Sequence, residues 1–90
     1  MPSKISKYAV EFVGTLLLSF IIFATGNFLA IGAALAIAVA LGGHLSGGAF
    51  NPAIALAMIY GGNISRDDFV PYVIAEIAGA VLGYELVRAL

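Results

Sequence analysis

The chain has 90 residues, of which 62% are hydrophobic and only 10% are charged, and its formal net charge is −1. A soluble domain commonly carries charge on about a quarter of its residues, so we expect lipid to be the solvent of this chain. The sequence has no cysteine and no basic run, which excludes disulfides and thiolate metal sites and argues against a nucleic-acid partner.

Three apolar segments predict three transmembrane helices in a single all-α membrane domain that covers residues 1–90. The first and third are close to the roughly 20 residues that cross a hydrocarbon core of about 30 Å, whereas the second, of roughly 16 residues, is short for a full span. Only the Gly26-Asn27 pair separates the first two segments. This pair predicts a tight turn and an antiparallel helical hairpin. The predicted spans cover residues 8–25, 28–43 and 71–89, with Pro71 opening the third.

The segment between the second and third spans predicts a re-entrant loop and a half-length helix, at about residues 44–60. Four glycines within seven positions, from Gly42 to Gly48, are expected to break the second helix. Asn51 suits the N-cap of a new helix, and Pro52 suits its first position. The apolar run that follows has about nine residues, or about 14 Å of helix, which is too short to span a membrane. Irregular backbone at membrane depth is tolerated only where protein buries it or where it lines a wet cavity.

The tripeptide Asn51-Pro52-Ala53 carries the strongest chemical signal. A helix that begins near the membrane centre directs its free N–H groups and the positive end of its dipole into the protein. The Asn51 amide adds donors there, and the glycine loop before it leaves carbonyl acceptors that need partners. Such a path suits a neutral hydrogen-bonding solute and opposes cations and protons. Taken alone, the tripeptide is equally compatible with a helix start in an ordinary loop.

These motifs resemble the N-terminal half of the major intrinsic protein family, the aquaporins and glycerol facilitators. The resemblance implies a half-aquaporin repeat, with three transmembrane helices and one re-entrant half-helix. It covers nearly the whole chain in the family's order. The segments that carry it are Glu11-Phe12-Val13-Gly14-Thr15, Leu29-Ala30-Ile31-Gly32, the loop from Gly43 to Ala53, Tyr72-Val73-Ile74-Ala75-Glu76 and Gly79-Ala80.

The resemblance also implies roles for individual residues. Asn51 would donate to the solute at the constriction, and Ile31 would belong to the outer selectivity filter. His44 would line the inner mouth or donate to nearby carbonyls, two roles that the sequence leaves open. Backbone carbonyls would line the inner half of the pore, at Gly47, Gly48, Ala49 and Phe50.

Other residues are expected to support this structure. Glu11 within a span is costly unless paired, so it is interpreted as a hydrogen-bond hub for the loop, with proton transfer as the alternative. Pro52 and Ala53 complete the helix start. Glu76 stands where glutamine is usual in the family, and the sequence offers no firm account of it. Gly79 and Gly83 form a small-residue stripe that favours tight packing within one protomer over a dimer face.

The resemblance covers only one of the two inverted halves that the family normally contains. The predicted function is therefore half of a channel for water or small neutral solutes. A second half would close the pore, and it could be an inverted copy, a separate subunit or a missing C-terminal part. The alternative is a non-conducting structural protein in a cellular or viral membrane assembly. No catalytic constellation is visible, so an enzyme is not expected, and neither is a cofactor or a metal ion.

Lysine and arginine placement predicts the orientation in the bilayer. Lys4, Lys7 and Arg66 fall on one side and Arg88 on the other. By the positive-inside rule, the N-terminus is expected to be cytoplasmic. An oligomer is expected, but copies in a single orientation cannot bring two half-helices face to face. An inverted homodimer would therefore require dual topology.

Overall fold

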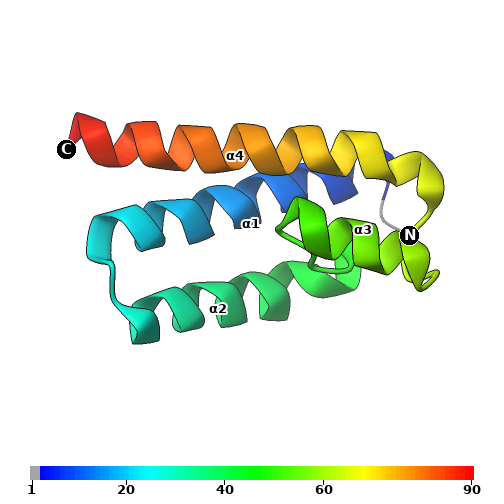
Figure 1. The fold of residues 1–90 in the computed structure, drawn as a ribbon, viewed down its shortest axis with the longest axis horizontal. Helices are drawn as coiled ribbons and strands as arrows, with labels where there is room; N and C mark the ends of the chain where they lie inside the picture. The colour runs from blue at the N-terminus through cyan, green and yellow to red at the C-terminus, as the bar shows by residue number, and fades with distance from the viewer. Residues whose placement is uncertain (1–2) are drawn as a thin grey trace.

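The computed structural model of the chain describes residues 3–90, and residues 1 and 2 of the predicted domain lie outside this description. The described part is helical and contains no strand. Three of its helical segments are long and apolar enough to cross a membrane, so the predicted all-α membrane fold is confirmed. In chain order the elements are α1 (Lys4–Thr25), α2 (Phe28–Ser46), α3 (Pro52–Tyr60), the 3-10 helix η1 (Arg66–Asp68) and α4 (Phe69–Ala89) (Figure 1).

A two-residue turn joins α1 and α2 into an antiparallel hairpin. Gly26 ends α1 in the left-handed region at φ 58°, and its N–H donates to the Ile22 carbonyl at 2.9 Å. Asn27 then caps α2, because its side-chain oxygen accepts from the N–H groups of Leu29 and Ala30, both at 3.0 Å. The Gly-Asn pair stops one helix and starts the next, as the sequence predicts.

The helix α4 runs alongside α1 in the same direction, and glycines let the two backbones approach closely (Figure 1). A Cβ atom on Gly83 would lie 2.7 Å from the Leu16 carbonyl oxygen, and one on Gly79 would overlap the Phe12 carbonyl oxygen. Any larger residue at either position would push the helices apart. The small-residue stripe of α4 therefore packs within the protomer, which is the use that the sequence favours.

The second helix extends further than the sequence predicts. The expected end was residue 43, with the loop beginning at 44, but α2 continues to Ser46. Packing offsets the weak helix propensity of this stretch, because Gly42 lies against α1, where a Cβ would be 2.5 Å from Val10 Cγ1. Gly47 ends the helix at φ 93°, with its N–H 2.7 Å from the Gly43 carbonyl oxygen. His44 consequently lies in the last helical turn and not in the loop.

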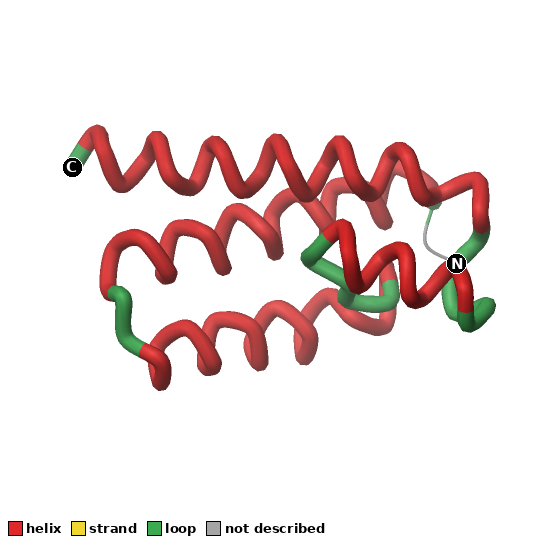
Figure 2. The backbone as a smooth tube through the Cα atoms, viewed as in Figure 1, coloured by secondary structure: helices red, strands yellow, loops and turns green. Residues whose placement is uncertain are grey.

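The short helix α3 packs against α4 and lies in the half of the molecule where the N-terminus is marked (Figure 2). Its nine residues correspond to about 14 Å, compared with about 33 Å for the 22 residues of α1. α4 begins at Phe69, two residues before the predicted start at Pro71. Pro71 fits there because N–H groups in the first turn have no partner within the helix.

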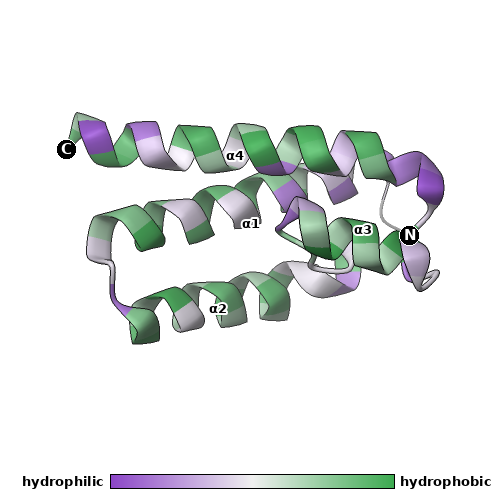
Figure 3. Ribbon diagram, viewed as in Figure 1, coloured by the Kyte–Doolittle hydropathy of each residue, from purple (hydrophilic) through white to green (hydrophobic). Residues whose placement is uncertain are grey.

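Polar residues gather at the two ends of the molecule, and apolar residues cover the helices between them (Figure 3). At the end formed by α1 and η1, the Asp68 side chain is buried and bridges the two elements. Lys7 Nζ lies 3.2 Å from its Oδ2, and the Tyr8 hydroxyl donates to its Oδ1 at 2.8 Å. Large apolar side chains remain exposed along every long helix, as a lipid-facing surface requires.

Candidate functional site

The loop from Gly47 to Phe50 connects α2 to α3 through a backbone that few residues adopt. Gly47, Gly48 and Phe50 all have positive φ, at 93°, 71° and 51°. Glycine tolerates this region, but for phenylalanine it costs on the order of 1 to 3 kcal/mol. Such a conformation persists only where surrounding contacts enforce it, and the contacts at Glu11 and at the Phe50 ring supply that enforcement.

Glu11 is fully buried in α1 and gathers the donors of the loop. Its Oε1 accepts from the Phe50 N–H at 2.8 Å, and its Oε2 accepts from the Ser46 hydroxyl at 2.6 Å and the Ala49 N–H at 3.3 Å. Ser46 Oγ in turn accepts from the Gly48 N–H at 3.2 Å. One carboxylate therefore sets the direction of consecutive peptide groups in the loop.

The carbonyls of the loop point away from Glu11. A trans peptide directs its N–H and C=O in opposite directions, so N–H groups that turn inward leave the preceding carbonyls turned outward. Within residues 3–90, no donor forms a hydrogen bond with the four carbonyl oxygens of the loop. These acceptors need water, a solute or another chain. They belong to Gly47, Gly48, Ala49 and Phe50.

Asn51 caps α3 with one end of its amide and leaves the other end free. The side-chain oxygen accepts from the N–H groups of Ala53 and Ile54, at 2.7 and 3.4 Å. Because the oxygen faces these donors, Nδ2 must face the opposite way, and it has no acceptor among the described residues. Pro52 takes the first helical position, where its missing N–H has no cost. An exposed amide donor thus stands at the positive end of α3.

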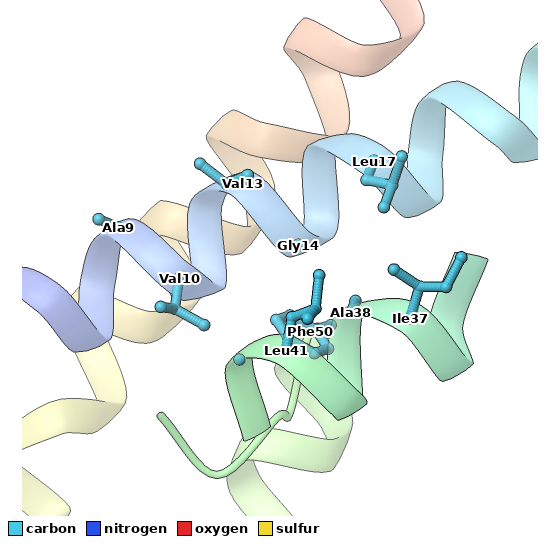
Figure 4. Close-up of a pocket in the computed structure, with 10 residues that line it drawn as sticks. Ala9, Val10, Val13, Gly14, Leu17, Ile37, Ala38, Leu41 and Phe50 are labelled. Carbon is cyan, nitrogen blue, oxygen red and sulfur yellow. The ribbon is translucent and has the colours of Figure 1, made fainter. Parts of the chain in front are cut away.

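The Phe50 ring fixes the loop against α1 and α2. It is buried and fills the space at Gly14, where a Cβ atom would overlap the ring. The ring and Gly14 both line an apolar cavity of about 340 Å³ between α1 and α2 (Figure 4). This cavity has no polar side chain in its lining and cannot orient a polar solute. Figure 4 shows the ring among Val10, Val13, Leu17, Ile37, Ala38 and Leu41.

A second cavity, of about 260 Å³, begins at the start of α3 and runs between α1 and α4. Its polar lining comes from Asn51, Thr15, Ser19 and Glu76, and the remaining lining is apolar. The apolar contributors are Leu18, Ile22, Phe23, Phe50, Pro52, Ile77 and Ala80. Asn51 therefore faces a groove that extends beyond the start of α3, with polar residues contributed by α1 and α4.

Two residues that the resemblance assigned to a pore lie away from Asn51. His44 is exposed and lines a different, polar cavity of about 330 Å³, together with Lys7, Asn63 and Ser65. Ile31 is half-buried in the first turn of α2, 20 residues before Asn51 in the chain. The structure thus brings Glu11, the loop and the start of α3 together, and it does not bring Ile31 to them.

Sequence reasoning missed two residues that hold the loop. Ser46 links Glu11 to the loop backbone, and its own carbonyl accepts from the Tyr72 hydroxyl at 2.6 Å. The position of Ser46 directly before the Gly47-Gly48 pair could have indicated its role. Tyr72 lies one helical turn before Glu76, a spacing that puts the two on one face of α4. Among the described residues, no group of three or more acidic, histidine or cysteine side chains could hold a metal ion.

Comparison with known proteins shows which family this chain resembles. The sequence model of the major intrinsic protein family matches residues 25–90. The chain is similar to Glycerol uptake facilitator protein-like 6 of Lactiplantibacillus plantarum, with 38% identity over 92 aligned residues that cover 92% of this chain and 43% of that protein. It is also similar to Aquaglyceroporin AqpS of Rhizobium meliloti, with 42% identity over 60 residues that cover 67% of this chain and 26% of that protein. The chain thus spans less than half the length of either relative. No solved structure matches it significantly.

Proposed function

The chain belongs to the major intrinsic protein family and is an integral, multi-pass membrane protein, and from this premise we propose that it is one half of a channel for water or small neutral solutes. The observation that carries the proposal is the pairing of four unbonded loop carbonyls with the free Nδ2 of Asn51 at the start of α3. The names of the two relatives refer to glycerol, which makes small polyols the first solutes to test.

The order of donors and acceptors supports passage of a neutral molecule. A solute with a hydroxyl group can donate to a loop carbonyl and then accept from Asn51, so each lost contact with water is replaced. The positive end of the α3 dipole opposes a cation at the same place.

A second half is required in this proposal because α3 is about 14 Å long and a hydrocarbon core is about 30 Å thick. The groove that starts at Asn51 and runs between α1 and α4 continues in the direction in which a facing half-helix would lie. The relatives are more than twice as long as the matched segment, which supports a second repeat as the partner.

We further propose that the N-terminus is cytoplasmic. Lys7 and η1 lie at the same end of the molecule, joined by the Lys7–Asp68 ion pair, so three of the four cationic side chains gather there. Positive residues favour the cytoplasmic side. If every copy has this orientation, the second half must be a different polypeptide segment, because two parallel copies cannot oppose their α3 helices.

The substitution Asn51→Asp tests the channel role in vesicles reconstituted from detergent, where the chain inserts in both orientations and opposed copies can bring two α3 helices together. Aspartate caps a helix as well as asparagine does, so the fold is retained, but the Nδ2 donor is replaced by a negatively charged acceptor. Loss of one hydrogen bond of about 1.4 kcal/mol corresponds to about a tenfold fall in water or glycerol permeability by stopped-flow light scattering.

Asn27→Asp is the matched control, because Asn27 caps α2 in the same way but lies in the turn at the far end of the hairpin. Its permeability should equal that of the native chain. Unchanged permeability in Asn51→Asp would refute the pore role. Vesicle shrinkage equal to that of empty liposomes, combined with a stable crosslinked oligomer, would support the non-conducting structural assembly instead.

A further inference from the structure

Glu76 is a buried carboxyl group that the proposed channel role does not use. It lies in the second turn of α4, its exposed fraction is 0%, and neither carboxyl oxygen has a hydrogen-bond partner within the described residues. Buried polar atoms are nearly always paired, so such an exception requires an explanation. An ionised carboxylate without donors at this depth would be very costly. The groups that surround Glu76 therefore decide whether it is protonated.

Helix register places Glu76 beside Glu11. The rings of Tyr8 and Tyr72 meet edge to face, with centroids 5.9 Å apart, where the parallel helices α1 and α4 begin to pack. Glu11 and Glu76 follow one turn further along their respective helices. Their carboxyl groups are neighbours, and the backbone N–H of Asn51 lies next to Glu76. Two acidic groups therefore share one buried space under the loop.

The hydrogen-bond donors around this pair all donate to Glu11. The Ser46 hydroxyl and the N–H groups of Ala49 and Phe50 bond to its two oxygens. Three donors thus stabilise Glu11 as a carboxylate, whereas neither Glu76 oxygen forms a hydrogen bond within the described residues, although the Asn51 N–H lies nearby. A second negative charge at contact distance from the first, without a donor or a cation, is strongly disfavoured, and such pairs hold one proton between them.

The other titratable groups on the surrounding elements do not supply a compensating charge. They are either paired elsewhere or exposed at the ends of their helices. Lys7 and Tyr8 on α1 both bind Asp68 of η1, and Tyr72 on α4 donates to the Ser46 carbonyl. His44 on α2 and Tyr60 at the far end of α3 are exposed.

We propose that Glu76 is a proton-bearing positioning residue: in its neutral form it shares its proton with the Glu11 carboxylate and holds the peptide between Phe50 and Asn51 in place. The transport consequence rests on the proposed function, but the protonation itself does not. Glu76 acts through Glu11 and the loop backbone, which in turn fix the outward carbonyls and the start of α3.

The sign of the pH dependence follows from the charge count. Ionisation of Glu76 adds a second negative charge beside Glu11, so the native loop is favoured at low pH and is lost as the pH rises. One proton is released in this step, so the ratio of intact to rearranged loop falls by at most about tenfold for each pH unit, within the pH range in which only the intact loop keeps its proton. Permeability that depends on the loop should fall with the same slope.

Infrared spectroscopy of the reconstituted chain in buffered D₂O tests the protonation directly. A protonated carboxyl group has a carbonyl stretching band that is separate from the carboxylate and amide bands. We expect this band at neutral pH in the native chain, its loss in Glu76→Gln, and its retention in Glu85→Gln. Glu85 is the matched control, since it is an exposed carboxylate on the same helix, 3.3 Å from Arg88. Absence of the band from the native chain, or its persistence in Glu76→Gln, would overturn the proposal.

Stopped-flow shrinkage over a pH series tests the positioning role. The native chain should lose permeability as the pH rises. Glu76→Gln keeps a neutral hydrogen-bond donor and should restore a pH-independent rate, whereas Glu85→Gln should behave like the native chain. A native rate that does not change with pH, although the infrared band disappears, would refute the positioning role. If the native chain conducts at no pH, the channel proposal fails, and the infrared band still decides the state of Glu76.

Discussion

Glu11→Ala should destabilise this protein more than any other single change to a charged side chain. The carboxylate of Glu11 satisfies the N–H groups of Ala49 and Phe50 and the hydroxyl of Ser46, and all four residues are buried. Ser46 can rotate its hydroxyl toward another acceptor, but the two backbone donors cannot move without unfolding the loop. The substitution therefore leaves two buried N–H groups without partners.

The magnitude follows from those two groups. An unsatisfied buried donor costs about 1 to 3 kcal/mol, so two of them lower the free energy of unfolding by about 2 to 6 kcal/mol. The positive φ of Phe50 adds to the effect, because the strain of that residue is then opposed by fewer contacts. We expect the loop to rearrange before the long helices separate, since α1 and α4 pack through glycines that Glu11 does not touch.

Titration with a denaturing detergent in mixed micelles, followed by far-ultraviolet circular dichroism, measures this difference. Glu85→Ala provides the control. Glu85 is 53% exposed and pairs only with Arg88, so its removal should change stability by about 0 to 1 kcal/mol. A Glu11→Ala variant within about 0.5 kcal/mol of Glu85→Ala would show that the loop does not depend on the carboxylate, and the reasoning would be wrong.

Two further substitutions test the packing around the site. Gly14→Ala should lower stability by about 1 to 3 kcal/mol in the same titration, because its Cβ would overlap the Phe50 ring. Adding Phe50→Leu to this variant should recover part of the loss. If the stability losses of the two substitutions simply add in the double variant, the contact is not responsible. Asp68→Ala should lower the free energy of unfolding by about 1 to 3 kcal/mol, since Lys7 and the Tyr8 hydroxyl both lose their buried partner. Lys7→Met keeps the Tyr8 bond and should lower it less. A larger loss in Lys7→Met than in Asp68→Ala would contradict this account.

Features set by neighbouring residues could be predicted from the sequence. The turn at Gly26 and Asn27 and the start of α3 at Asn51 and Pro52 depend on caps that act within three or four residues. The end of α2 could not be predicted in the same way. Its glycines break helices in isolation, but here Gly42 packs against α1, a contact between residues far apart in the chain.

The same limit applies to the candidate site. The motif indicated that Asn51 and the loop belong together, and Glu11 was expected to support them. The sequence could not show which loop atoms Glu11 would bind, because Ser46 and Phe50 are 35 and 39 residues away. Nor could it show that Glu76 would lie beside Glu11 without a hydrogen bond, since that placement depends on the register between α1 and α4.

The cap of α3 also prevents rotation of the Asn51 side-chain amide. A free asparagine amide can turn and offer either its oxygen or its nitrogen to a passing molecule. Asn51 has no such choice, because its oxygen is bonded to the N–H groups of Ala53 and Ile54. Turning the amide over would set its N–H groups against those of the backbone and leave both sides unpaired. The helix thus sets the polarity of the side chain at its own start, and any molecule that reaches Asn51 meets a donor whose orientation has already been fixed by folding.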